Sequence, residues 1–338
     1  MGFCVSRNQL QALLDSWQAD YDVYAPRRFS GGGRFSDTDC IRYGKILRPE
    51  EIEFEEKSQY SFKEVLTPIS QTLFFFAEGH TKEEDGPRKG AVIFLRSCDL
   101  HALKRLDDMY LHNGPGDYYY HRLREHLKIV LMGCKHTYEN CFCVSMGTNI
   151  SGNYDLSIDS QPDGTYHLDC KEPTWEALLQ SLGGAVIPVE PAHVTENQIQ
   201  VKIPENLTAR VGESGLWNQY DSRCIACGRC NFVCPTCTCF TMQDLYYSEN
   251  GKAGERRRVW ASCMVDGFTD VAGGGSYRKK NGQRMRFKVL HKVLDYKQRN
   301  GYHMCVGCGR CDDVCPEYIS FSGCVNHLEE AMAEVTEK

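Results

Sequence analysis

Apolar residues near the start of the chain recur at helical spacing. Ser6 precedes this pattern, and Gln9 follows Ser6 by three residues, which is the signature of a capping box. The spacing predicts an amphipathic helix that begins just after Ser6. Met1-Gly2 with Ser6 also matches an N-myristoylation pattern, but the capping role explains Ser6 better. The apolar positions of this helix are Leu10, Leu13, Leu14 and Trp17.

Two short apolar runs, 91–95 and 129–132, predict buried strands. The residues between them have helical spacing, with Asp99 as a candidate cap and a break at 112–117. A strand, a helical crossover and a strand normally produce a parallel pair. Cys98 follows the first strand and Cys134 follows the second. Because parallel strands end at the same edge of a sheet, we expect these two cysteines to lie close together.

The following segment predicts a hairpin and then a helix. Residues 155–160 and 165–170 alternate around the turn sequence QPDG, and residues 175–182 have helical spacing before Gly183-Gly184. A last strand is expected near 186–189, and periodicity is weak from about 190 to 218. We therefore expect an α+β protein. Its predicted parts are an N-terminal mixed α/β domain with a parallel strand pair at 1–205 and a C-terminal α-helical dicluster ferredoxin domain at 206–338.

Composition narrows the class of protein. The chain has 338 residues, a net charge of −6 and 19 cysteines. The charge does not favour nucleic-acid binding. So many cysteines fit either a secreted disulfide framework or a metal protein in a reducing compartment. No secretory signal is visible, and no apolar run approaches the ~20 residues of a membrane span. These observations favour a cytoplasmic metal protein without a membrane partner.

Two copies of one cysteine motif carry the strongest chemical signal. Residues 224–235 and 305–316 both read C-x2-C-G-R-C-x3-C-P, the bacterial ferredoxin run for a [4Fe–4S] cluster. In two-cluster proteins the fourth cysteine of each run ligates the other cluster. We therefore expect one cluster on Cys224, Cys227, Cys230 and Cys315. We expect the other on Cys305, Cys308, Cys311 and Cys234.

Alternative metal chemistry is weaker. Zinc sites use pairs of cysteines rather than this run repeated twice, although a zinc-bearing binding module remains the competing class. Cys230, Cys234 and Cys237 also have the spacing of radical-SAM enzymes, but they overlap a complete ferredoxin run. The gap between the two motifs resembles that of the α-helical ferredoxins in multi-subunit reductases, so we expect helices to fill it.

A third group of cysteines has less regular spacing. It comprises Cys98, Cys134, Cys141 and Cys143. The parallel strands bring two members together, and the short loop GCKHTYENCFC adds the others. Four convergent thiols fit an iron–sulfur cluster or a zinc site. The scattered cysteines are expected to be small buried hydrophobic residues, namely Cys4, Cys40, Cys170, Cys263 and Cys324. The roles of Cys237 and Cys239 stay open, as does an alternative role for Cys263.

Basic residues concentrate between the two motifs. Residues 256–299 contain twelve Lys or Arg against three Asp, a net charge of +9. Three explanations stay open: a collar that offsets anionic clusters, a docking face for an acidic partner, and a solvated helix surface.

The cysteine-rich blocks resemble a known family. They read SCDLHALKRLD, GCKHTYENCFCVSMGT, CIACGRCNFVCPTCTCF and WASCMVDGFTDVAGG. They are similar to the iron–sulfur electron-transfer family that anaerobic sulfite reductases share with the β subunits of soluble hydrogenases. The resemblance is closest to the sulfite reductase members and covers nearly the whole chain. It implies that the third cysteine group also holds a [4Fe–4S] cluster.

The resemblance also implies a function. A family member of this kind relays electrons from an NADH-oxidising FAD flavoprotein subunit to a sirohaem subunit that reduces sulfite to sulfide. The alternative is a β-type electron-transfer subunit of a soluble hydrogenase or sulfhydrogenase. No dinucleotide fingerprint, Walker loop or clear sirohaem-binding stretch is visible in the sequence. We therefore expect a chain that conducts electrons in a heteromeric complex and is not catalytic alone.

Overall fold

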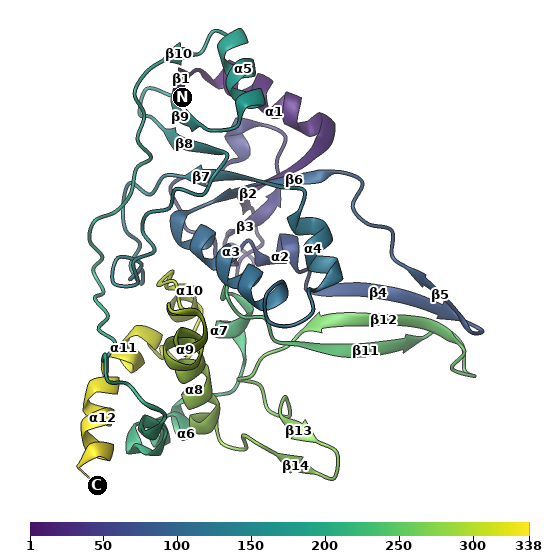
Figure 1. The fold of residues 1–338 in the computed structure, drawn as a ribbon, viewed down its shortest axis with the longest axis vertical. Helices are drawn as coiled ribbons and strands as arrows, with labels where there is room; N and C mark the ends of the chain where they lie inside the picture. Colours follow the sequence, from purple (N-terminus) through teal and green to yellow (C-terminus); the bar gives the residue numbers. More distant parts are fainter. Residues whose placement is uncertain (338) are drawn as a thin grey trace.

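The computed structural model describes residues 1–337, and its largest element is an eight-stranded sheet (Figure 1). The strand order is β10-β1-β9-β8-β7-β6-β2-β3. The central strands β2, β6, β7 and β8 are parallel to one another. The remaining strands, β3 on one side and β9, β1 and β10 on the other, pair in an antiparallel manner. The bounds are β1 Gly2–Val5, β2 Tyr21–Phe29, β3 Cys40–Lys45, β6 Gly90–Leu95, β7 Leu127–Met132, β8 Leu156–Ser160, β9 Tyr166–Cys170 and β10 Ala185–Val186.

Helices cover both faces of this sheet. In β6, Val92 and Phe94 face a core that includes α1 and α5, whereas Ile93 and Leu95 face a core that includes α2, α3 and α4. Burial on both faces explains why β6 has no polar residue. The helix bounds are α1 Arg7–Asp20, α2 Lys63–Leu66, α3 Ser97–Tyr110, α4 Tyr118–Arg124 and α5 Pro173–Ser181, with a 3-10 turn η1 at Pro49–Glu51.

Several local predictions are confirmed. Ser6 and Gln9 form the capping box of α1. β6 and β7 form the predicted parallel pair, and β8 and β9 form the predicted hairpin. Two details differ. The last strand is only two residues long, and Arg96 rather than Asp99 precedes the first turn of α3. Asp99 is instead buried in an ion pair with Arg310.

The C-terminal part is largely helical, as predicted. Its core joins Trp217 and Tyr220 to Val289 and Val293, and to Phe321 near the chain end. The helices lie below the main sheet in Figure 1. Their bounds are α6 Gln219–Arg223, α7 Arg229–Phe232, α8 Asn281–Leu290, α9 Tyr296–Asn300, α10 Arg310–Asp313, α11 Phe321–Asn326 and α12 Leu328–Thr336. Shorter turns are the 3-10 helices η2 Ala209–Glu213 and η3 Gly215–Asn218 and the π-helix η4 His291–Asp295.

The expectation that helices fill the gap between the cysteine motifs is wrong for its first half. This segment contributes β11 Phe240–Tyr246, β12 Ala253–Trp260 and a small hairpin, β13 Asp270–Val271 with β14 Gly275–Ser276. β11 and β12 join β4 Ser70–Ala77 and β5 His80–Glu83 in a four-stranded antiparallel sheet that projects to one side (Figure 1). One edge of β12 thus pairs with β4, a strand from the other half of the chain, and the other edge pairs with β11.

The two halves also meet at the second cysteine motif. Val306 and Cys308 belong to the same apolar cluster as Ile93, Leu95 and the buried side of α3. The domain division near residue 205 remains a prediction. Among residues 1–337, no helix combines the length and the apolar character needed to span a bilayer.

Candidate iron–sulfur sites

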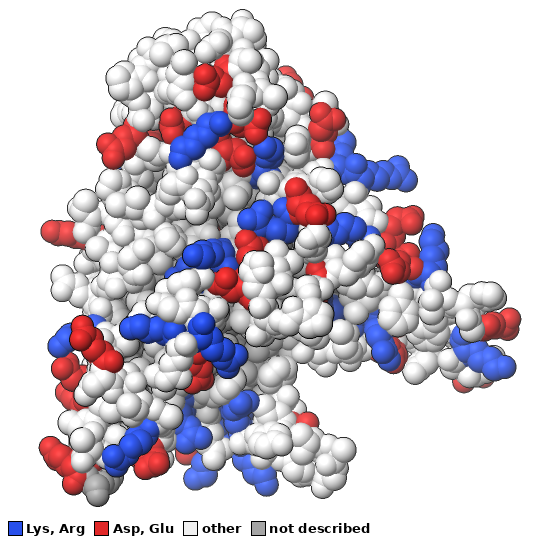
Figure 2. Space-filling view, viewed as in Figure 1, with Lys and Arg blue, Asp and Glu red and all other residues white. Residues whose placement is uncertain are grey.

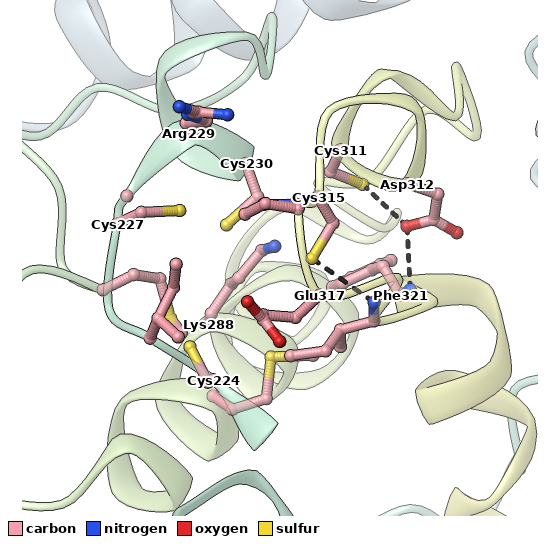
Figure 3. A pocket seen from close by; sticks show the side chains of 16 residues that line it. Cys224, Cys227, Arg229, Cys230, Lys288, Cys311, Asp312, Cys315, Glu317 and Phe321 are labelled. Carbon is pink, nitrogen blue, oxygen red and sulfur yellow. Dashed lines mark hydrogen bonds between the residues drawn. The ribbon is translucent and has the colours of Figure 1, made fainter. Parts of the chain in front are cut away.

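The first cavity brings together the four cysteines predicted for one cluster. Cys224 and Cys227 come from the loop between α6 and α7, Cys230 lies in α7, and Cys315 follows α10. Their sulfur atoms point into one shared space, whereas the sulfur of Cys311 turns toward Asp312 (Figure 3). The residues of one motif therefore meet the last cysteine of the other, although the motifs are far apart in the sequence.

Left-handed glycines shape both cysteine loops. Gly228 and Gly309 have φ of 74° and 69° and precede the first turns of α7 and α10. A Cβ on Gly309 would lie 2.1 Å from the carbonyl oxygen of Asn140, so only glycine fits there. Two positions earlier in each motif, Ala226 and Gly307 also have positive φ, 56° and 65°. The duplicated sequence therefore folds into a duplicated backbone.

A second cavity contains the other predicted set. It is lined by Cys305, Cys308, Cys311 and Cys234. Cys230 and Cys311 line both cavities, as do Lys288 and Phe321. The two thiol groups are therefore adjacent and share a wall.

The residues of both cavities fit an anionic [4Fe–4S] cluster. Each cavity is lined by five cysteines, and these include the four that the sequence predicts as ligands of one cluster. Backbone N–H groups point at two of these sulfurs: Ala226 donates to Cys224 Sγ at 3.4 Å and Ile319 to Cys315 Sγ at 3.3 Å. Bonds of this kind help to set cluster potentials. Within residues 1–337, no three His, Cys, Asp or Glu side chains are grouped to hold a single metal ion.

Burial makes free thiolates costly at the second cavity. It raises the pKa of Cys305 to about 12 and that of Cys308 to about 11. Burial outweighs the lowering effect of Lys292 on the pKa of Cys305 and that of Arg310 on the pKa of Cys308. Bound metal ions reverse this preference for the neutral thiol because a coordinating thiol is deprotonated. Cluster binding and folding of this region are therefore expected to be coupled.

The third predicted group also comes together. Cys98 lies in the first turn of α3, Cys134 follows β7, and Cys141 and Cys143 lie in the next loop. Burial raises the pKa of Cys143 to about 12, and the neighbouring Cys141 and Cys134 contribute to this rise. Burial also raises the pKa of Cys98, to which Cys143 contributes. Cys143 thus lies within electrostatic reach of the other three thiols.

The third group adjoins the second cavity. The Cys141 thiol lies 3.6 Å from the carbonyl oxygen of Cys308, and the N–H of Phe142 donates to the Gly307 carbonyl at 2.8 Å. Phe142 also lines the second cavity. Lys57 Nζ lies 3.8 Å from Cys141 Sγ and 3.1 Å from the Cys308 oxygen. The loop that carries two thiols of the third group is therefore packed directly on the second motif.

The remaining cysteines divide into two kinds. Cys237, Cys239 and Cys263 lie beside the second cavity, where Asn231 Nδ2 donates to Cys263 Sγ at 3.0 Å and Lys63 Nζ donates to the Cys237 carbonyl at 3.0 Å. The hydrogen bond from Cys263 lowers the pKa of Cys239. Of the scattered cysteines, the four other than Cys263 line neither cavity. As expected of small hydrophobic residues, Cys40, Cys170 and Cys324 are buried, and Cys4 is half-buried.

The basic stretch 256–299 does not form one exposed patch. Four of its twelve basic residues are buried: Arg258, Arg284, Lys288 and Lys292. Over the C-terminal region in Figure 2, basic and acidic side chains are interspersed. Burial lowers the pKa of Lys288, but the Cys230 and Cys311 sulfurs outweigh this effect and raise it well above its usual value. Sequence reasoning did not identify these lysines individually, because lysines four residues apart usually mark a solvated helix face.

Comparisons with known proteins support the iron–sulfur interpretation. Residues 223–319 match a family model described as a 4Fe-4S dicluster domain. The chain is also 26 % identical over 322 residues to sulfhydrogenase 2 subunit beta of Pyrococcus furiosus, and this match covers 86 % of the chain and 92 % of the relative. No solved structure matches the chain significantly. These findings support [4Fe–4S] clusters without fixing their number. They favour the hydrogenase-type alternative over the sulfite reductase interpretation.

Proposed function

We propose that the chain is an iron–sulfur electron-transfer subunit of a heteromeric oxidoreductase, of the β-subunit type found in sulfhydrogenase. The supporting observation is the contact between three thiol groups. The two cavities of the dicluster region share Cys230 and Cys311 as lining residues, and the third group touches the second motif through Cys141. When bound, the clusters would supply one-electron redox chemistry.

The proposed ligands follow the three groups. Cys224, Cys227, Cys230 and Cys315 would hold the first cluster, and Cys305, Cys308, Cys311 and Cys234 the second. The third would be held by Cys98, Cys134, Cys141 and Cys143. The exposed position of Cys227 brings the first site to the surface. The chain places the three sites next to one another, buries the second site and surrounds the sites with positively charged side chains.

The relative is named as the β subunit of a sulfhydrogenase, so the partners we propose are the other subunits of such a complex. A sulfite reductase complex, with a flavoprotein and a sirohaem subunit, is the second candidate, based on the four cysteine-rich sequence blocks. The tagged chain should be purified anaerobically with its native partners, and the complex should be assayed with hydrogen and with sulfite. We expect hydrogen-dependent electron transfer. Sulfite-dependent turnover alone would favour the second candidate, and robust turnover by the isolated chain would contradict both.

The cluster number is tested by iron analysis. Anaerobically purified chain should contain about twelve irons and as much acid-labile sulfide, from three four-iron clusters. Cys141→Ser should reduce the iron to about eight, because it removes a ligand of the third group. Cys4→Ser is the matched control, because Cys4 lies in β1 and outside every group. A wild-type value near eight that Cys141→Ser leaves unchanged would eliminate the third cluster, and zinc in place of iron would refute the relay.

A further inference from the structure

Two lysines of one helical segment are buried between the two cavities. Lys288 lies in α8 and Lys292 in the π-helical turn η4 that continues it. Both lysines are only 4 % exposed. Residues four apart on a helix share a face, and this face points inward, toward the cysteines. Single π-turns occur frequently at functional sites.

The two ammonium groups are placed differently. Lys288 lines both cavities, and its Nζ lies 5.1 Å from the centre of the Phe321 ring that also lines both. Figure 3 shows Lys288 reaching in among the cysteine sulfurs of the first cavity. Lys292 lines only the second cavity, where its Nζ lies 3.4 Å from Cys234 Sγ and 2.9 Å from Thr236 Oγ1. Among the residues that the structure describes, the second cavity is therefore lined by two ammonium groups and no carboxylate. In the first cavity Lys288 and Arg229 are accompanied by Asp312 and Glu317.

These charges have no carboxylate partner in the part of the chain that the structure describes. No Asp or Glu oxygen there lies within 4.0 Å of either Nζ, in contrast to the buried pair Arg310–Asp99 and to Lys57, which contacts Asp313 at 2.6 Å. Burying an unpaired ammonium costs several kcal/mol in general, so such groups persist where an anion compensates them. The cavities around Lys288 and Lys292 offer mainly cysteine sulfurs. Asp312 and Glu317 also line the first cavity, but neither forms an ion pair with Lys288.

We propose that Lys288 and Lys292 are built-in counter-charges for the two clusters of the dicluster region and that they raise the reduction potential of the second cluster above that of the first. The proposal rests on the proposed function, because it presupposes clusters in both cavities. Reduction adds a negative charge to a cluster, and a nearby fixed positive charge stabilises that reduced form. Electrons that enter at the exposed first site are therefore drawn inward to the second. Both lysines act on the clusters through the charge of their ammonium groups, and neither is a cluster ligand.

The test is a redox titration of the full chain with its clusters in place, followed by electron paramagnetic resonance. Lys292→Met should lower the potential of the second cluster and leave the first nearly unchanged, whereas Lys288→Met should lower both. At a fixed potential we expect the ratio of reduced to oxidised second cluster to fall about tenfold in Lys292→Met, which equals 59 mV for a one-electron couple. Lys292→Arg should retain the wild-type potential. Lys297→Met is the control, because Lys297 is exposed on α9.

Each outcome decides the proposal. Unchanged potentials in both Met variants, or an equal change in Lys297→Met, would overturn it. If a Met variant loses iron, the Gln variant at the same position is titrated in its place. Lys288→Gln and Lys292→Gln remove the charge but keep a polar group at the end of the side chain. Iron lost in Gln but retained in Arg would support the counter-charge role, whereas iron lost in Arg as well would overturn it. Failure of the proposed function is distinguishable, because the wild-type chain would then show no cluster signals in the titration.

Discussion

The two copies of the cysteine motif have the same backbone and opposite surroundings. In the first copy Cys227 and Arg229 are exposed, and the loop faces solvent. In the second copy Cys308 and Arg310 are buried, and Arg310 forms an ion pair with Asp99 of α3 at 2.7 and 2.9 Å. The spacing of the cysteines fixes the loop, while the element packed on the loop fixes its exposure and charge. The same cysteine pattern can therefore form a cluster site at the surface in one copy and a buried cluster site in the other.

The ligand exchange proposed above would be the strongest link between the copies, so its loss should have the largest effect. Cys315→Ser lies in the second copy but should remove the cluster of the first cavity, because Cys315 lines that cavity. Cys234→Ser should conversely remove the cluster of the second. Each variant should lose about four irons, measured with the cluster signals that remain. Cys324→Ser, a buried cysteine of α11 that lines neither cavity, is the control. If Cys315→Ser instead removed the cluster of the second cavity, and Cys234→Ser that of the first, each motif would supply all four ligands of its own cluster.

The two arginines should differ strongly in their effect on stability. Arg310→Ala leaves Asp99, which is fully buried, without its partner, and breaking a buried pair in this way costs about 3–5 kcal/mol. Arg229→Ala removes an exposed side chain at the equivalent position and should change stability by less than about 0.5 kcal/mol. Chemical denaturation of the anaerobically prepared protein, compared at equal iron content, measures both. Similar losses in the two variants would show that the difference in surroundings has no energetic consequence.

A smaller contrast is expected at the left-handed positions. Gly307→Ala would place a Cβ 2.5 Å from the Phe142 carbonyl oxygen, so it should destabilise the protein by about 2 kcal/mol or more. Ala226→Gly relieves a left-handed alanine in the solvent-facing copy, and we expect a gain of about 0.5 kcal/mol. Thermal unfolding of the two variants at equal iron content provides the measurement. A Gly307→Ala protein as stable as wild type would contradict the tight packing of the second copy on the third cysteine loop.

The spacing of residues close together in the sequence correctly predicted local features of the fold. The capping box at Ser6 and the parallel pair β6–β7 follow from local spacing. The predicted closeness of Cys98 to Cys134 stays a prediction, although Cys98 lies within electrostatic reach of Cys143 in the loop that follows Cys134. The pairing of β12 with β4 could not be predicted in this way, because the partner strand lies in the other half of the chain. The same holds for the burial of Lys288 and Lys292. Their spacing is that of an ordinary solvated helix face, and only the packing of α8 against both cysteine loops reveals that they point inward.

The pairing of β12 with β4 also has a consequence for synthesis of the protein. Ala77 of β4 pairs with Ala253, and Ser70 pairs with Val259, so β4 leaves the ribosome about 180 residues before its partner. At roughly 5–20 residues per second this interval is about 9–36 s. Throughout it, one edge of a strand that contains Leu73-Phe74-Phe75-Phe76 has no partner strand, although β5 can already pair with the other edge. An unpaired apolar edge invites association with other chains, so we expect β4 to be exposed to such association in the nascent chain until β12 arrives.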